Sequence, residues 1–189
     1  MRISKRRWWP IAAIAIAIPV TAAIITQSGF FRRSDLRLEV DLSKRVLYAI
    51  QNDEIIAEYD IAAGSDRHPT PDGSFTVTRI VWNPPEPASK APAARRINLR
   101  NRKDLLGVKI YFSDSGYFIH GTNDPELIGT AAAKGCLRMD AGQAEELARV
   151  LMEHGGAQKS DDWFERVIRS PDDTHVIILP MSVGMDIGD

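Results

Sequence analysis

The amino-acid sequence predicts a mainly β domain with a few short helices, preceded by an N-terminal apolar segment. Three observations support this fold class. After residue 36, most periodic segments alternate apolar and polar residues, which is typical of strands with one buried face. The one long segment with helical spacing is 141–153, and residues 8–31 contain no charged side chain. With 189 residues and 44% hydrophobic content, the chain is large enough for one such domain but too short for a multidomain protein.

The predicted elements follow one another as short strands with turns between them. Strands are predicted at 36–42, 46–50, 54–61, 74–81, 108–112, 117–120 and 175–179. Residues 83–94 contain four prolines, a density that excludes a helix or a central strand and predicts a surface loop. Helices are predicted at 141–153, with Asp140 as the N-cap, and at 162–168.

The uncharged run at 8–31 is long enough to cross a bilayer, since about 20 apolar residues span the hydrocarbon core. Four basic residues precede it and two follow it, which favours a cytoplasmic N-terminus and an exported body. Two interpretations stay open: a retained membrane anchor, or a signal peptide cleaved at a small-residue site near Ala23. We therefore expect residues 1–33 to be a signal peptide or anchor, residues 36–180 the folded domain, and residues 181–189 a C-terminal tail. The domain is then periplasmic, or is held outside the cytoplasmic membrane by its N-terminal segment.

The charge distribution argues against nucleic acid as a partner. The first 33 residues carry six basic side chains and no acid, so the rest of the chain has 18 basic residues against 25 acidic ones. A body with an excess of acids lacks the positive surface that binds phosphate backbones. With one cysteine and no closely spaced histidine pair, a zinc site is not expected, and no cofactor is required.

The candidate chemistry lies at Cys136 and His120. An unpaired cysteine in an exported protein is either a buried apolar residue or a reactive thiol, and composition alone leaves both interpretations open. His120 ends a predicted strand, from which an imidazole can be aimed at a thiol to take its proton. Gly135, directly before the cysteine, lets a substrate and backbone amide donors approach closely.

The order of the motifs makes this hypothesis more specific. The sequence contains Thr-Pro-Asp-Gly-Ser-Phe at 70–75, Trp-Asn-Pro-Pro at 82–85, Ile-His-Gly-Thr-Asn at 119–123 and Gly-Cys-Leu-Arg-Met at 135–139, the last followed by a helix. In this order and over residues 38–179, the chain resembles the L,D-transpeptidase catalytic domain, also called the YkuD domain, of bacterial cell-wall enzymes.

The resemblance implies a β-sandwich-like fold and a thiol enzyme that acts on peptidoglycan tetrapeptide stems. Such an enzyme forms a thioester after the diaminopimelate residue, releases the terminal D-alanine, and passes the acyl group to an amine of a second stem or of an envelope protein. Carried onto this sequence, Cys136 matches the nucleophile and His120 the general base. The backbone carbonyl of Gly121 matches the group that orients the histidine, and the backbone amides around Gly135 match the oxyanion hole.

Four residues are expected to contact the substrate: Arg138, Lys134, Gly135 and Asn123. Arginine binds carboxylates through two parallel hydrogen bonds, and the stem peptide carries several carboxylates. An ion pair within the protein is the structural alternative for Arg138, and a role in fixing the loop is the alternative for Asn123.

The sequence departs from the family pattern directly before Gly135. A serine and a histidine are common there, whereas this chain has Ala133 and Lys134. We expect the ammonium of Lys134 to favour the thiolate form of the cysteine. The sequence alone leaves three functions open: an L,D-transpeptidase, an L,D-carboxypeptidase or other hydrolase on the same scaffold, and a catalytically silent domain that binds the envelope.

Overall fold

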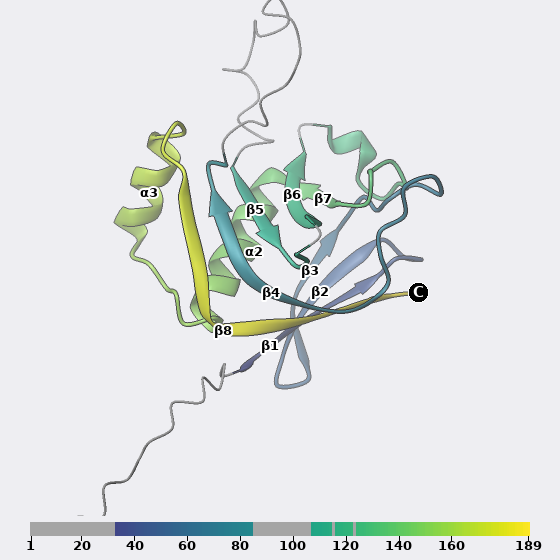
Figure 1. Cartoon of the computed structure of the whole chain (residues 1–189), viewed down its shortest axis with the longest axis horizontal. Coiled ribbons are helices and arrows are strands. Elements are labelled where there is room, and N and C mark those ends of the chain that lie inside the picture. Colours follow the sequence, from purple (N-terminus) through teal and green to yellow (C-terminus); the bar gives the residue numbers. More distant parts are fainter. Residues whose placement is uncertain (1–32, 85–106, 115, 123) are drawn as a thin grey trace, which may run out of the picture. The chain divides into compact units, whose positions relative to one another are not determined.

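The computed structural model describes residues 33–84, 107–114, 116–122 and 124–189 (Figure 1). The strands are β1 (Arg33–Asp41), β2 (Val46–Gln51), β3 (Glu54–Asp60), β4 (Gly73–Trp82), β5 (Val108–Tyr111), β6 (Phe118–Thr122), β7 (Leu137–Asp140) and β8 (His175–Gly188). The helices are the one-turn 3-10 helix η3 (Pro125–Leu127), α2 (Ala141–His154) and α3 (Asp161–Arg169). The predicted mainly β class is therefore confirmed.

Two predicted segments fall on residues that the structure does not describe. They are the N-terminal apolar run and most of the proline-rich loop at 83–94. Among the residues that it does describe, no helix is both long and apolar enough to cross a membrane.

All eight strands belong to one sheet, in the order β3-β2-β1-β8-β4-β5-β6-β7. The chain directly after β3 also pairs with β7 at the opposite end of this order. The amide of Ala62 donates to the carbonyl of Arg138 at 2.7 Å, and the amide of Arg138 donates to the carbonyl of Ala62 at 3.0 Å. These two hydrogen bonds join the ends of the sheet, so that it nearly closes on itself, consistent with the predicted sandwich-like fold.

Helix α2 covers the inner side of this sheet and builds the core with it. Its buried face consists of Ala144, Leu147, Ala148, Leu151 and Met152. These side chains pack in one cluster with inward residues of the strands, among them Leu38, Ile110, Ile119 and Leu137. The Asp140 side chain accepts a hydrogen bond from the amide of Gln143 at 3.1 Å, which confirms the predicted N-cap.

Trp82 is a core residue. It is 1% exposed, and its indole Nε1 donates to the sulfur of Met152 at 3.3 Å. Its ring also contacts Trp163 and Phe164, which fastens α3 to the end of β4. The motif at 82–85 therefore contributes to packing through its tryptophan.

Two sequence predictions about the C-terminal half were wrong. The last strand was predicted at 175–179 and a tail from residue 181, but β8 continues to Gly188. Its second half lies between β1 and β4, paired in parallel with β1 and antiparallel with β4. Pro180 falls where the register with β4 shifts, and a bulge tolerates the missing amide hydrogen.

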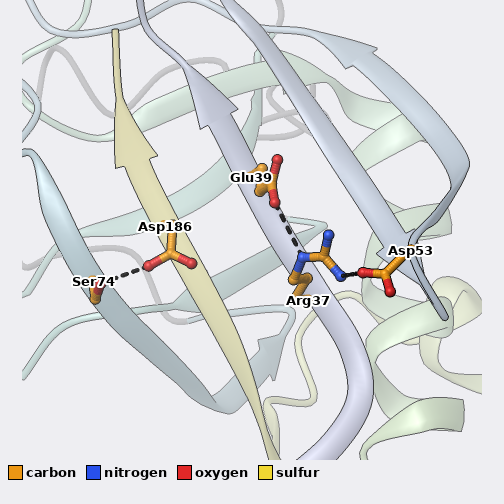
Figure 2. A network of polar contacts seen from close by, with 5 residues as sticks. All are labelled: Arg37, Glu39, Asp53, Ser74 and Asp186. Carbon is orange, nitrogen blue, oxygen red and sulfur yellow. Dashed lines mark hydrogen bonds and ion pairs between the residues drawn. The ribbon is translucent and has the colours of Figure 1, made fainter.

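Polar contacts on the outer face tie β1, β4 and β8 to their neighbours (Figure 2). Arg37 on β1 donates to Glu39 at 3.0 Å and to Asp53 in the β2–β3 turn at 2.9 Å. Ser74 on β4 donates to Asp186 on β8 at 2.6 Å. In this part of the sheet, the arginine thus has two acidic partners.

Candidate active site

The candidate histidine lies on β6, between two positively charged residues on the neighbouring strands. Register places His120 opposite Lys109 of β5 and opposite Arg138 of β7. Side chains directly opposite each other in a sheet share one face. The three therefore form a row across β5, β6 and β7, on the outer face, because Ile119 and Leu137 point into the core.

His120 is 9% exposed, and its imidazole is hydrogen-bonded to the backbone of the next residue. Its Nδ1 lies 2.7 Å from the carbonyl oxygen of Gly121. Because a carbonyl oxygen can only accept, Nδ1 carries the hydrogen in this contact, and Nε2 is left with the lone pair that can take a proton. The backbone carbonyl of Gly121 thus contacts the imidazole directly.

The electrostatic surroundings keep His120 neutral. Burial is the main reason that the pKa of the imidazole falls from 6.5 to about 4. The hydrogen bond to Gly121 opposes this shift, while the positive charges of Arg138 and Lys109 add to it. At neutral pH the side chain is therefore an uncharged imidazole, the form that can act as a base.

The candidate nucleophile lies beside this row. Cys136 directly precedes β7, whose first residue, Leu137, is in register with Ile119 of β6. The cysteine is the last residue of the bend before this strand, two residues before Arg138. Cys136 is half-buried and is a free cysteine. The pairing of β6 with β7 thus brings Cys136, at the start of β7, near the strand that carries His120, sixteen residues earlier in the sequence.

Gly135 is required by both its backbone and its surroundings. Its φ of +93° is in the region that residues with a side chain rarely adopt. A Cβ atom there would also lie 2.6 Å from Cε1 of Tyr117 and 3.3 Å from the carbonyl oxygen of Pro69. The backbone before the cysteine is therefore packed directly against a ring and a neighbouring loop.

The sequence predicts a loop at 64–73, but its contact with the segment before Cys136 was not predicted. Residues 61–70 pair with the segment before Cys136: Ala133 donates to the carbonyl of Ala63 at 2.9 Å and accepts from the amide of Ser65 at 3.0 Å. The loop is closed on itself by the amide of Gly64, which donates to the hydroxyl of buried Thr70 at 2.9 Å. Gly64 was the available signal, because a Cβ there would clash with backbone atoms of residues 68–70.

The remaining predicted contact residues differ in their placement. Arg138 is half-buried in the row described above, and its Nε is buried with no hydrogen-bond partner among the described residues. The alternative for Arg138, an ion pair, is not found among the described residues. Lys134 is exposed and stands two residues before the cysteine. Asn123 lies outside the described residues.

The other three histidines lie in other surroundings. The amide of His68 donates to the carbonyl of Ser65, the Nδ1 of His154 lies 3.4 Å from a carboxylate oxygen of Asp35, and the ring of His175 packs against Trp163. Within the part of the chain that the structure describes, no group of three or more His, Cys, Asp or Glu residues is arranged to hold a metal ion.

Comparisons with known proteins agree on one family. A family model, the L,D-transpeptidase catalytic domain or YkuD, matches residues 35–178. A protein of Bacillus licheniformis named "Putative L,D-transpeptidase YkuD" is 30% identical over 115 residues, which are 61% of this chain and 59% of the relative. Its namesake in Bacillus subtilis is 29% identical over 114 residues, 60% of this chain and 59% of the relative. The matched region thus spans less than two thirds of either relative.

A solved structure shares the fold at low sequence identity. The Ldtfm-avibactam carbamoyl enzyme superposes with a TM-score of 0.51 and 17% identity, over 82% of this chain and 49% of the other. At this identity, the superposition is evidence for the fold alone.

Proposed function

The chain belongs to the L,D-transpeptidase catalytic domain (YkuD) family, and from this membership we propose that it is a cysteine-dependent L,D-transpeptidase of peptidoglycan stem peptides. The observation that carries the proposal is the arrangement of His120 on β6, hydrogen-bonded to Gly121, next to the strand that Cys136 precedes. A buried neutral imidazole with a lone pair on Nε2, one strand away from a free thiol, can activate that thiol.

In the proposed acylation step, Nε2 of His120 takes the proton of the Cys136 thiol, and the sulfur attacks the carbonyl carbon between diaminopimelate and the terminal D-alanine. Backbone amides near Gly135 stabilise the negative oxygen that develops on this carbon. The imidazolium then gives its proton to the departing amine. The C–N bond breaks, D-alanine leaves, and a thioester to Cys136 remains.

In the proposed second step, an amine of another stem or of an envelope protein attacks the thioester. His120 takes a proton from this amine, a new amide bond forms, the C–S bond breaks, and the imidazolium returns the proton to the sulfur to regenerate the thiol. If water attacks in place of the amine, the same sequence of proton transfers produces a shortened stem peptide. The acceptor thus decides between transfer and hydrolysis, while the residues that form the thioester are the same.

We further propose that Arg138, Lys134, Gly135 and Asn123 contact the donor stem. The orphaned Nε of Arg138 supports its part in this, because a buried donor without a partner is costly unless a ligand satisfies it. The exposure of Lys134 leaves its ammonium accessible to a substrate carboxylate.

An enzyme that acts on the cell wall must work outside the cytoplasm. The basic flanks of the apolar run at 8–31 support export of the domain, as either a periplasmic protein or a membrane-anchored one. Detection of full-length chain in membrane fractions supports the anchor. A soluble mature form that begins near Ala23 supports the cleaved signal peptide.

The proposal is tested by incubating the protein with disaccharide-tetrapeptides and identifying the products by mass. Cross-linked dimers are expected from a transpeptidase. Disaccharide-tripeptides without dimers would indicate a carboxypeptidase. Unchanged substrate, both alone and with an added envelope-protein amine, would contradict the proposed activity and favour a silent binding domain.

A further inference from the structure

The outer face of the sheet beside His120 carries two aromatic rings in contact with each other, a cation over each ring, and a third cation, Arg138, on the strand next to His120. Arg79 lies over the ring of Tyr111 at 4.1 Å, and Lys109 lies over the ring of Phe118 at 4.6 Å. The Phe118 ring in turn contacts Tyr111 at 5.3 Å and His120 at 5.3 Å between centroids. We call Arg79, Lys109 and Arg138, with the rings of Tyr111 and Phe118, the cationic strip.

Strand register explains how the strip is built. One row across the sheet is Arg79, Tyr111 and Phe118 on β4, β5 and β6. The next row, two residues along each strand, contains Lys109 and Arg138 on either side of His120. Since strands lie about 4.8 Å apart, the backbones of Lys109 and Arg138 are about 10 Å apart. The side chains of Lys109 and Arg138 are long enough to bind the same carboxylate above His120.

The cations of the strip have no acidic partners among the described residues. None of the ion pairs found there includes Arg79, Lys109 or Arg138. Arg37, on the same sheet, shows the contrast, since it contacts both Glu39 and Asp53 (Figure 2). After residue 33 the chain has more acids than bases, so unpaired cations gathered at one place are not a consequence of composition.

Folding does not account for this arrangement either. Like charges close together repel, and the positive charges of Lys109 and Arg138 make the proposed base harder to protonate. Arg138 also buries its Nε without a partner. A bound anion would relieve all three costs at once.

We propose that the cationic strip is a subsite for the carboxylates of the donor stem peptide, with Lys109 and Arg138 holding the carboxylate nearest the scissile bond and Arg79 one farther along the stem. This inference rests on the proposed function and assigns Lys109 and Arg79 a role in binding the substrate. The cation–π contacts hold both side chains over the rings, so less conformational freedom is lost when an anion binds. The proposed ligand is a peptide with free carboxylates. The same peptide with amides in their place should bind more weakly.

The test compares binding of free and amidated stem peptides to the full chain carrying Cys136→Ala, which prevents turnover. Calorimetry is done with the free tetrapeptide, with peptides amidated at one carboxylate at a time, the terminal carboxylate included, and with the fully amidated peptide. We expect one of the single amidations to weaken binding by about 10- to 100-fold, the usual cost of losing a charge-assisted pair. Adding Lys109→Met should weaken binding of the free peptide by a similar factor. The free peptide and the peptide with that single amide should then bind equally well.

Matched variants separate the strip from general effects of charge. Arg79→Met should reduce the preference for a free carboxylate over an amide at a different position of the stem peptide. Lys159→Met removes an exposed ammonium from the loop between α2 and α3. It should leave the affinities of the free and the amidated peptides unchanged. Equal affinity for free and amidated peptides, or a preference that survives both Lys109→Met and Arg79→Met, would overturn the subsite.

Turnover by the unmodified protein distinguishes failure of this inference from failure of the proposed function. Equal turnover of free and amidated stems would support the transpeptidase and overturn the subsite. Carboxylate-dependent binding that Lys109→Met abolishes, without product from any stem, would support the subsite and overturn the proposed reaction. If no stem peptide binds or reacts, both are overturned.

Discussion

Nδ1 of His120 lies 2.7 Å from the carbonyl oxygen of Gly121, the next residue in the chain. A peptide carbonyl therefore fixes the tautomer of the imidazole, a task that a carboxylate performs in many catalytic sites. A neutral carbonyl stabilises the imidazolium less than a carboxylate would, and burial weakens the base further. His120 is therefore a weak base that is neutral and able to accept the thiol proton.

We expect Cys136→Ala to abolish turnover and leave the fold intact. Cys136 is half-buried just before β7 and lies outside the packed core, so removal of one sulfur opens little volume. Activity on disaccharide-tetrapeptides and far-ultraviolet circular dichroism check the two parts. In the unmodified protein, a carbapenem should add its mass to the chain. Absence of that adduct after prolonged exposure would count against an acylating Cys136.

We expect His120→Ala to slow acylation by about 10²- to 10⁴-fold, the range for loss of a positioned base. Stopped-flow measurement of carbapenem acylation gives this rate directly. The controls are alanine substitutions of His68, His154 and His175, which have other contacts and should change the rate little. Similar losses for all four histidines would show that His120 has no special role.

The pH profile should reflect the depressed pKa of His120. The imidazole must be neutral to accept the thiol proton, and its pKa is about 4 in place of 6.5. The acid limb of kcat/KM that belongs to this group should therefore be centred near pH 4, and the base should already be fully neutral at about pH 6. An acid limb centred near 6.5 would contradict a buried, neutral His120.

Lys109→Met should move this acid limb toward higher pH. The positive charge of Lys109 is one of the causes that lower the pKa of His120, so its removal makes the imidazole easier to protonate. An NMR titration of the His120 ring in Cys136→Ala, with and without Lys109→Met, measures the shift. Lys159→Met is the matched control and should leave the titration unchanged. An unchanged titration with Lys109→Met would show that its ammonium does not act on the base.

Gly135→Ala should reduce activity much more than Gly129→Ala. Both glycines have positive φ, +93° and +80°, so alanine strains either backbone by about 1 kcal/mol. Only at Gly135 would the added Cβ also meet the ring of Tyr117, whereas nothing lies within 4 Å at Gly129. The ratio of the two acylation rates isolates this clash from backbone strain. Equal rates would show that the backbone before Cys136 adapts without cost.

Local patterns predicted most of the elements. The alternation of apolar and polar residues placed β1 to β6 within a few residues of their observed bounds, and the helical spacing with Asp140 placed α2 to within one residue. These predictions succeed because the period of a segment and its cap are properties of neighbouring residues. The motifs around His120 and Cys136 likewise identified the family without any knowledge of contacts.

The sequence by itself thus determined the mainly β class, the identity of the candidate nucleophile and base, and the family. Only the tertiary structure decided that residues 137–140 form a strand, that β8 continues beyond Pro180, and that Ala62 joins the ends of the sheet through Arg138. It also decided that Lys109, which lies outside both motifs, is opposite His120. The physical reason is that strands are stabilised by hydrogen bonds to partners far away in the chain, and the register of those partners is set by the packing of the whole sheet around α2.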